Sequence, residues 1–85
     1  MNTGTVLYLA DVSRIAAADP AELPGELGLN PEWTEIAASA PGWPSVPDAL
    51  LRLVERGAGR VGLCFARPGP EGRPELSLVR ERLFG

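Results

Sequence analysis

The stretch from residue 45 to residue 66 constrains the fold most, because it joins a strong helix signal to a strong strand signal. Ser45 precedes Asp48 by three residues, which approximates the capping box that satisfies free backbone N–H groups in the first turn of a helix. Apolar residues then recur at helical spacing along one face. Gly57 follows, and glycine readily adopts the left-handed conformation that ends many helices. We therefore predict a helix near residues 46–56.

The strand that follows, predicted over residues 60–66, has no polar face. Its larger apolar side chains alternate with small ones, so that one face carries Val61, Leu63 and Phe65 and the other carries Gly62, Cys64 and Ala66. A strand exposed on one side normally alternates apolar with polar residues. This pattern is instead typical of a strand that is covered on both sides and lies centrally in its sheet.

Two further strands are predicted, near residues 5–10 and near residues 75–80. The first is rich in β-branched, aromatic and aliphatic residues, which favour strands. The second follows a turn region rich in proline and glycine, so it should pair antiparallel with the strand at 60–66. Leu76, Val79 and Leu83 also fit helical spacing, and a C-terminal helix over residues 75–84 remains an alternative.

A second helix is predicted near residues 31–40. Asn30 is a good N-cap, and Pro31 fits the first helical position, where a backbone N–H has no partner to lose. The apolar residues that follow share one helical face: Trp33, Ile36, Ala37 and Ala40.

Together these elements predict an α+β fold in a single globular domain over residues 1–85. We expect a small mixed three-stranded sheet with short helices on one face. About 50 residues separate the first two strands, enough for a crossover that makes them parallel if they are neighbours. An 85-residue chain is near the lower limit for independent folding, so a partner or a homodimer would help it.

The chain offers little to catalysis. It has no histidine and no lysine, so the usual general base near neutral pH and the usual Schiff-base amine are both missing. Glu32 and Glu35 would share one side of the predicted helix, where a solvated acidic face is the simplest interpretation. Cys64 has no neighbouring cation in the sequence to lower its pKa. We expect no enzyme, and no catalytic, cofactor or metal site.

The sequence also bears on location. One cysteine cannot form an internal disulfide. The apolar run from Val6 to Ala10 is too short for a signal peptide or a membrane span. We expect a cytoplasmic protein without a membrane partner.

The charge is divided unevenly along the chain. Residues 1–48 contain seven acidic residues and one arginine, a net charge of −6. Residues 49–85 contain four acidic residues and seven arginines, a net charge of +3. Such asymmetry can steer a partner, and it also arises where two halves of one small domain face each other; both interpretations remain open.

Arginines are concentrated in the predicted C-terminal hairpin, and we take four as candidate binding residues: Arg67, Arg73, Arg80 and Arg82. A basic two-stranded ribbon can lie against phosphates, which makes nucleic-acid backbone binding the alternative function. The interleaved aromatic side chains expected of a platform for single-stranded bases are missing, because Phe65 has the pattern of a buried residue and Phe84 stands alone. The overall net charge of −3 also opposes such binding.

Trp43 is the strongest candidate for contact with a protein. It lies in a loop framed by Pro41 and Pro44, and tryptophan is enriched at binding hot spots. The alternative is that Trp43 closes the core as a lid. The leading hypothesis is a small non-enzymatic interaction protein (an adaptor, inhibitor or accessory protein) that binds another protein or its own copy. A small-ligand-binding domain is a third possibility, which requires a concave pocket with convergent polar groups.

Overall fold

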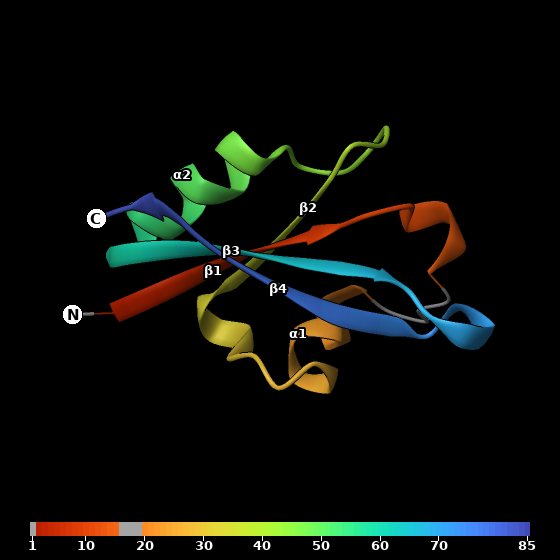
Figure 1. Ribbon diagram of the computed structural model, residues 1–85. Coiled ribbons are helices and arrows are strands. Elements are labelled where there is room, and N and C mark those ends of the chain that lie inside the picture. Colours follow the sequence, from red (N-terminus) through yellow and green to blue (C-terminus); the bar gives the residue numbers. More distant parts are fainter. Residues whose placement is uncertain (1, 16–19) are drawn as a thin grey trace.

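The computed structural model describes residues 2–15 and 20–85, with the backbone alone described for Pro20 and residues 78–80. It contains one four-stranded mixed sheet in the order β2-β1-β3-β4 (Figure 1). The strands are β1 (Asn2–Leu9), β2 (Thr34–Ala38), β3 (Ala58–Pro68) and β4 (Pro74–Phe84). The helices are α1 (Leu23–Glu26) and α2 (Val46–Arg56). The α+β class is as predicted.

The three predicted strands are present and pair as expected. β1 lies parallel to β3, with Val6 opposite Leu63 and Leu9 opposite Ala66. β3 and β4 form an antiparallel hairpin. Because β4 continues to Phe84, the alternative of a C-terminal helix is wrong.

The helix predicted near residues 31–40 is also wrong. The Asn30 cap is real, since its side-chain oxygen accepts a hydrogen bond from the backbone N–H of Glu32 at 3.0 Å. It opens only a short 3₁₀ helix, Pro31–Trp33, after which the chain extends into β2. β2 pairs in parallel with β1, from Thr34 opposite Thr5 to Ala38 opposite Leu9. Pairing with a distant strand has overridden a local helical pattern.

The predicted helix at 46–56 is confirmed as α2. The Ser45 hydroxyl accepts a hydrogen bond from the backbone N–H of Asp48 at 3.3 Å, and Gly57 ends the helix with φ of 110°. α2 buries Ala49 and Leu53 against one face of the sheet, where they join a core made of Val6, Ala37, Ala58, Val61 and Leu63.

The opposite face carries a second core beneath α1. Leu23 of α1 is buried with Leu7, Leu9, Ala38 and Ala66, and Figure 1 shows α1 and α2 on opposite sides of the sheet. The prediction of helices on one face is therefore wrong. Successive residues of β1 point to opposite faces, and both faces of this central strand carry apolar residues that must be covered.

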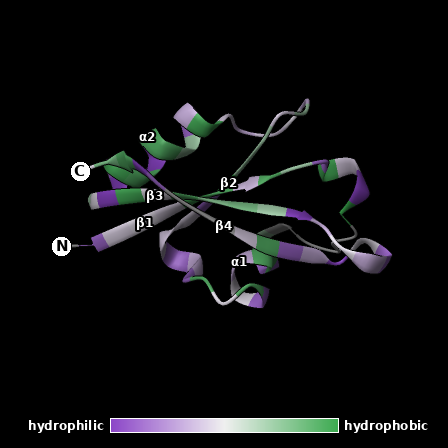
Figure 2. Cartoon of the chain, in the orientation of Figure 1, coloured by the Kyte–Doolittle hydropathy of each residue, from purple (hydrophilic) through white to green (hydrophobic). Residues whose placement is uncertain are grey.

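Coverage of this second face is incomplete. α1 packs where β1 ends, near Leu7 and Leu9. The described elements leave the face open where β1 begins, at Thr3 and Thr5. Both strands border this open part; in Figure 2 the start of β1 is hydrophilic to neutral and the middle of β3 is hydrophobic.

Candidate interaction surface

The open part of the second face forms a shallow groove of about 470 Å³ across three strands. We call it the Gly62 groove. Its lining comes from β1 (Thr3, Gly4 and Thr5), β3 (Arg60, Val61, Gly62, Leu63 and Cys64) and β4 (Glu81 and Arg82). Most of the lining surface is apolar, and Thr5 of β1 lies directly opposite Gly62 in the β1–β3 pair.

Gly62 makes the floor of the groove hollow. A β-carbon at this position would find the backbone oxygen of Glu81, at 3.8 Å, as its nearest described neighbour outside the adjoining residues. Its φ is not in the left-handed region either. Glycine in a strand interior weakens the strand, and it often marks a place where a ligand or another backbone approaches closely. Internal packing therefore does not require the glycine.

Two arginines border the hollow. Arg82 lies directly opposite Gly62 in the β3–β4 pair, and Arg60 lies two residues before Gly62 on β3. Arg60 and Arg82 thus flank Gly62 on the same face of the sheet, next to a register shift in the β3–β4 pair between Val61 and Gly62. Both are exposed, and the ion pairs among described residues involve other arginines. The Arg82 side chain donates one long hydrogen bond, 3.4 Å, to the backbone oxygen of Gly85.

Glu81 does not neutralise these arginines. It lies opposite Leu63, whose side chain belongs to the core beneath α2. Residues opposite each other in a pair point to the same face. The Glu81 carboxylate is therefore on the α2 side of the sheet, and Glu81 borders the groove through its backbone.

Cys64 lies further along the groove, next to the second core. It is half-buried and packs against the cluster that contains Leu7 and Ala66. Burial raises the pKa of the Cys64 thiol, so the thiol is protonated at neutral pH. A protonated thiol is a weak nucleophile. Cys64 therefore lines the groove without supplying a reactive group.

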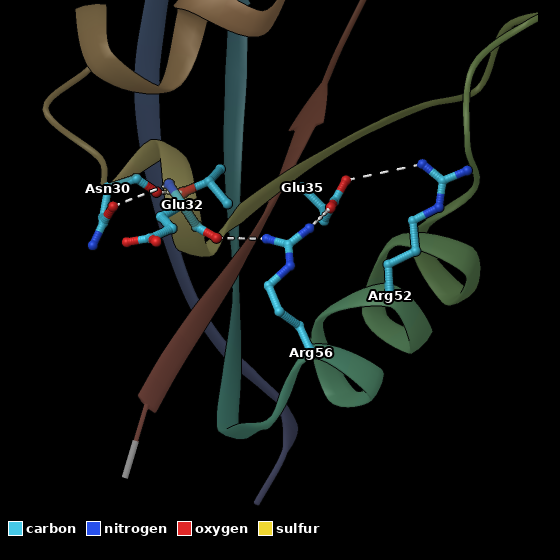
Figure 3. A network of polar contacts seen from close by, with 6 residues as sticks. Asn30, Glu32, Glu35, Arg52 and Arg56 are labelled. Atoms are coloured by element: carbon cyan, nitrogen blue, oxygen red, sulfur yellow. Dashed lines mark hydrogen bonds and ion pairs between the residues drawn. The ribbon is translucent and has the colours of Figure 1, made fainter.

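The acidic residues near β2 belong to a polar network that ties β2 to α2 (Figure 3). The Glu35 carboxylate forms ion pairs with Arg56 and, at 3.9 Å, with Arg52. Arg56 also donates a hydrogen bond to the backbone oxygen of Glu32, at 2.5 Å. Glu32 and Glu35 therefore do not share a helix face as expected, and Glu35 is paired with cations of this chain.

Trp43 lies at the other edge of the sheet, beyond β2. It is half-buried and packs against the second core. It also borders a separate groove of about 300 Å³ together with Pro24, Pro31, Ile36 and Pro44. The chain closes back on β2 here, because the backbone N–H of Ala38 donates to the oxygen of Pro44 at 3.0 Å. Trp43 therefore has contacts of the kind expected of a core lid, with part of its surface exposed.

The four hairpin arginines do not gather on one face. Arg67 is opposite Glu75 and follows Phe65 by two residues, on the α2 side. Arg82 points to the other face, and the β3 residue opposite it lies roughly 17 Å along the strand from Arg67. Arg73 is exposed at the hairpin turn, and the Arg80 side chain lies outside the described part of the molecule.

Other kinds of site find little support in the described residues. No group of three or more metal-ligating side chains occurs within them. No helix in this part of the chain has the length and apolar character needed to cross a membrane. No protein-family model, curated protein or solved structure matches the chain.

Most residues of the Gly62 groove are absent from the predicted binding set. Among the members of that set whose side chains the structure describes, Arg82 alone borders the groove, whereas Thr3, Thr5, Arg60 and Gly62 were not selected. One signal in the sequence pointed there: a glycine in the middle of a strand otherwise rich in apolar residues. The position of the groove depends on which strands are neighbours, and that is a property of the folded chain.

Proposed function

We propose that this chain is a non-enzymatic protein-binding domain whose contact surface is the Gly62 groove. The single observation that carries the proposal is the hollow at Gly62, which internal packing does not require. Arg60 and Arg82 at its border have no described carboxylate as a partner. A sheet surface with an apolar floor and a charged border resembles the layout of many protein interfaces.

The geometry favours a protein over nucleic acid. Successive bases stack on several aromatic side chains, but Phe65 and Tyr8 stack edge to face with each other, 5.5 Å between ring centres, on the face opposite the groove. Phe84 is exposed but is a single aromatic side chain at the end of β4. The arginines of the hairpin point to different faces. The chain also carries a net charge of −3, which opposes attraction to phosphates.

The groove also favours a protein over a small ligand. Small-molecule sites are normally concave and enclose most of the ligand surface. The Gly62 groove is shallow and open, and its polar side chains are distributed over three strands rather than gathered in an enclosed cavity. A protein surface can cover such a site as a lid, whereas a small molecule would remain largely in solvent.

Affinity capture from the cells that make this protein tests the proposal. Three baits are compared: the intact chain, Gly62→Leu, which fills the hollow, and Glu55→Leu, which adds the same side chain at an exposed position on α2. A protein retained by the intact chain and by Glu55→Leu but lost with Gly62→Leu supports the proposal. If the three baits retain the same proteins, or if nuclease treatment removes what the groove retains, the proposal is wrong.

A further inference from the structure

The Gly62 groove shares its face of the sheet with a raised acidic feature. α1 and the residue before it stand over the end of β1, held by the buried side chains of Leu23 and Pro24. This feature carries Glu22 and Glu26, both exposed, and Glu26 also borders a groove that it shares with Arg73 of the hairpin turn. We call residues 22–26 the acidic mound. One face of the molecule thus has a hollow at one end and a mound at the other.

The charges of the two features are complementary. The groove is bordered by Arg60 and Arg82, and the mound carries Glu22 and Glu26. Within one chain these groups make no ion pair that involves only described residues. Unlike the Glu35 carboxylate, which is matched with Arg52 and Arg56, the charges of groove and mound remain available to a second molecule.

We infer that the partner of the Gly62 groove is a second copy of this chain, an inference that rests on the proposed function. β1 runs from the groove, at Thr3 and Thr5, toward the mound, which packs on Leu7 and Leu9. A two-fold axis that is parallel to the sheet and crosses β1 at a right angle turns a second copy face to face with the first and reverses its strands. The mound of each copy then enters the groove of the other.

This arrangement stops at two copies, and every contacting group occurs twice in the interface, once from each copy. In a two-fold interface the same patch is presented by both copies, so each contact occurs in duplicate. Glu22 and Glu26 of one copy meet Arg60 and Arg82 of its partner, and the outer turn of the mound lies over Gly62. A side chain larger than a hydrogen atom at Gly62 would hold the two surfaces apart.

Sedimentation velocity over a concentration series tests the inference at low ionic strength, where exposed charge pairs are least screened. We expect the intact chain to shift from monomer to dimer as concentration rises. Arg82→Glu and Glu26→Arg should each weaken dimerisation roughly tenfold or more, since each change replaces two attractive pairs by two repulsive ones. The double variant Arg82→Glu/Glu26→Arg should recover most of the loss, and Arg67→Glu, on the other face, should change little.

Several results would overturn the inference. A chain that stays monomeric at every concentration has no such dimer. A dimer that tolerates both Gly62→Leu and Arg82→Glu forms through another surface, and a double variant no better than the single ones removes the predicted pairing. Circular dichroism verifies that each variant is folded, and Arg82→Gln replaces Arg82→Glu if the latter is not. A monomer that still loses a captured protein on Gly62→Leu retains the proposed function and excludes only the second copy as partner.

Discussion

Two glycines on neighbouring strands should respond in opposite ways to the same substitution. Gly4 of β1 lies opposite Val61 of β3, one residue before Gly62. A β-carbon at Gly4 would lie 3.2 Å from both terminal methyl carbons of Leu53 on α2, which is tighter than ordinary van der Waals contact. At Gly62 the corresponding nearest described atom is 3.8 Å away. Gly4 is therefore required by helix–sheet packing and Gly62 is not.

The magnitudes follow from two opposing effects. Replacing glycine by alanine inside a strand should stabilise by about 0.5–1 kcal/mol, because the unfolded chain loses conformational freedom. Overpacking a core with an extra methyl group costs about 1–3 kcal/mol. Gly62→Ala should show only the gain. Gly4→Ala should show the difference, a net loss of roughly 0–2.5 kcal/mol.

The steric explanation predicts a specific coupling with Leu53. Leu53 is fully buried, and Leu53→Ala alone should cost about 2–5 kcal/mol. In that background the new methyl group at Gly4→Ala meets a cavity, so the substitution should become stabilising. The coupling in a double-mutant cycle should be about 1–3 kcal/mol.

Urea unfolding followed by tryptophan fluorescence gives all of these values. A Gly4→Ala variant as stable as Gly62→Ala, or a cycle with no coupling, would refute the account of Gly4. A Gly62→Ala variant that loses more than about 1 kcal/mol would show that the fold does require the hollow, against the strand-propensity argument.

Three further predictions concern a cap, a half-buried side chain and a thiol. Ser45→Ala should destabilise the protein by about 1 kcal/mol in the same unfolding assay, because the Asp48 N–H loses its acceptor; no change would mean that water replaces the cap. Trp43→Ala should lower the free energy of unfolding by about 1–3 kcal/mol, less than the loss expected at a fully buried tryptophan. An unchanged free energy of unfolding would instead indicate that Trp43 is a free binding residue. Because the pKa of the Cys64 thiol is raised, the contribution of this thiol to the free energy of unfolding should be constant at neutral pH. It should fall as pH rises beyond the ordinary thiol pKa, since the thiol of the unfolded chain loses its proton first. Measuring the unfolding midpoint against pH, with Cys64→Ser as control, checks the sign.

The parts of the fold that follow from the sequence are those whose signals are local. The Ser45 hydroxyl and Gly57 define α2 without reference to the rest of the chain, and both act as predicted. β2 is the contrasting case. Its five residues, Thr34–Ala38, are too few to separate a period of 2 from a period of 3.6. Its alanines favour a helix intrinsically, and the backbone of β1 decides the outcome.

The predicted binding residues failed to converge for a related reason. Arg67 and Arg82 belong to one hairpin, but their positions relative to its register send them to opposite faces. The pairing also shifts in register between Leu63 and Phe65, and no local pattern in the sequence predicts this shift. Arginine content therefore indicated that a basic surface exists without showing which arginines form it.

The uneven charge of the two halves now has a physical interpretation. One part of it is internal, because Glu35 from the acidic half is paired with Arg52 and Arg56 from the basic half. Another part is displayed on a single face, with Glu22 and Glu26 at one end and Arg60 and Arg82 at the other. α2 has 11 residues, so it extends about 16 Å, and it can cover only one side of the sheet; α1, with four residues, covers part of the other. A chain this short therefore leaves sheet surface bare, but a merely bare surface would gain stability from a β-branched residue at position 62. Glycine there forgoes that stability beside two arginines that form no ion pair with a described side chain, which is the combination expected where a second surface must approach closely.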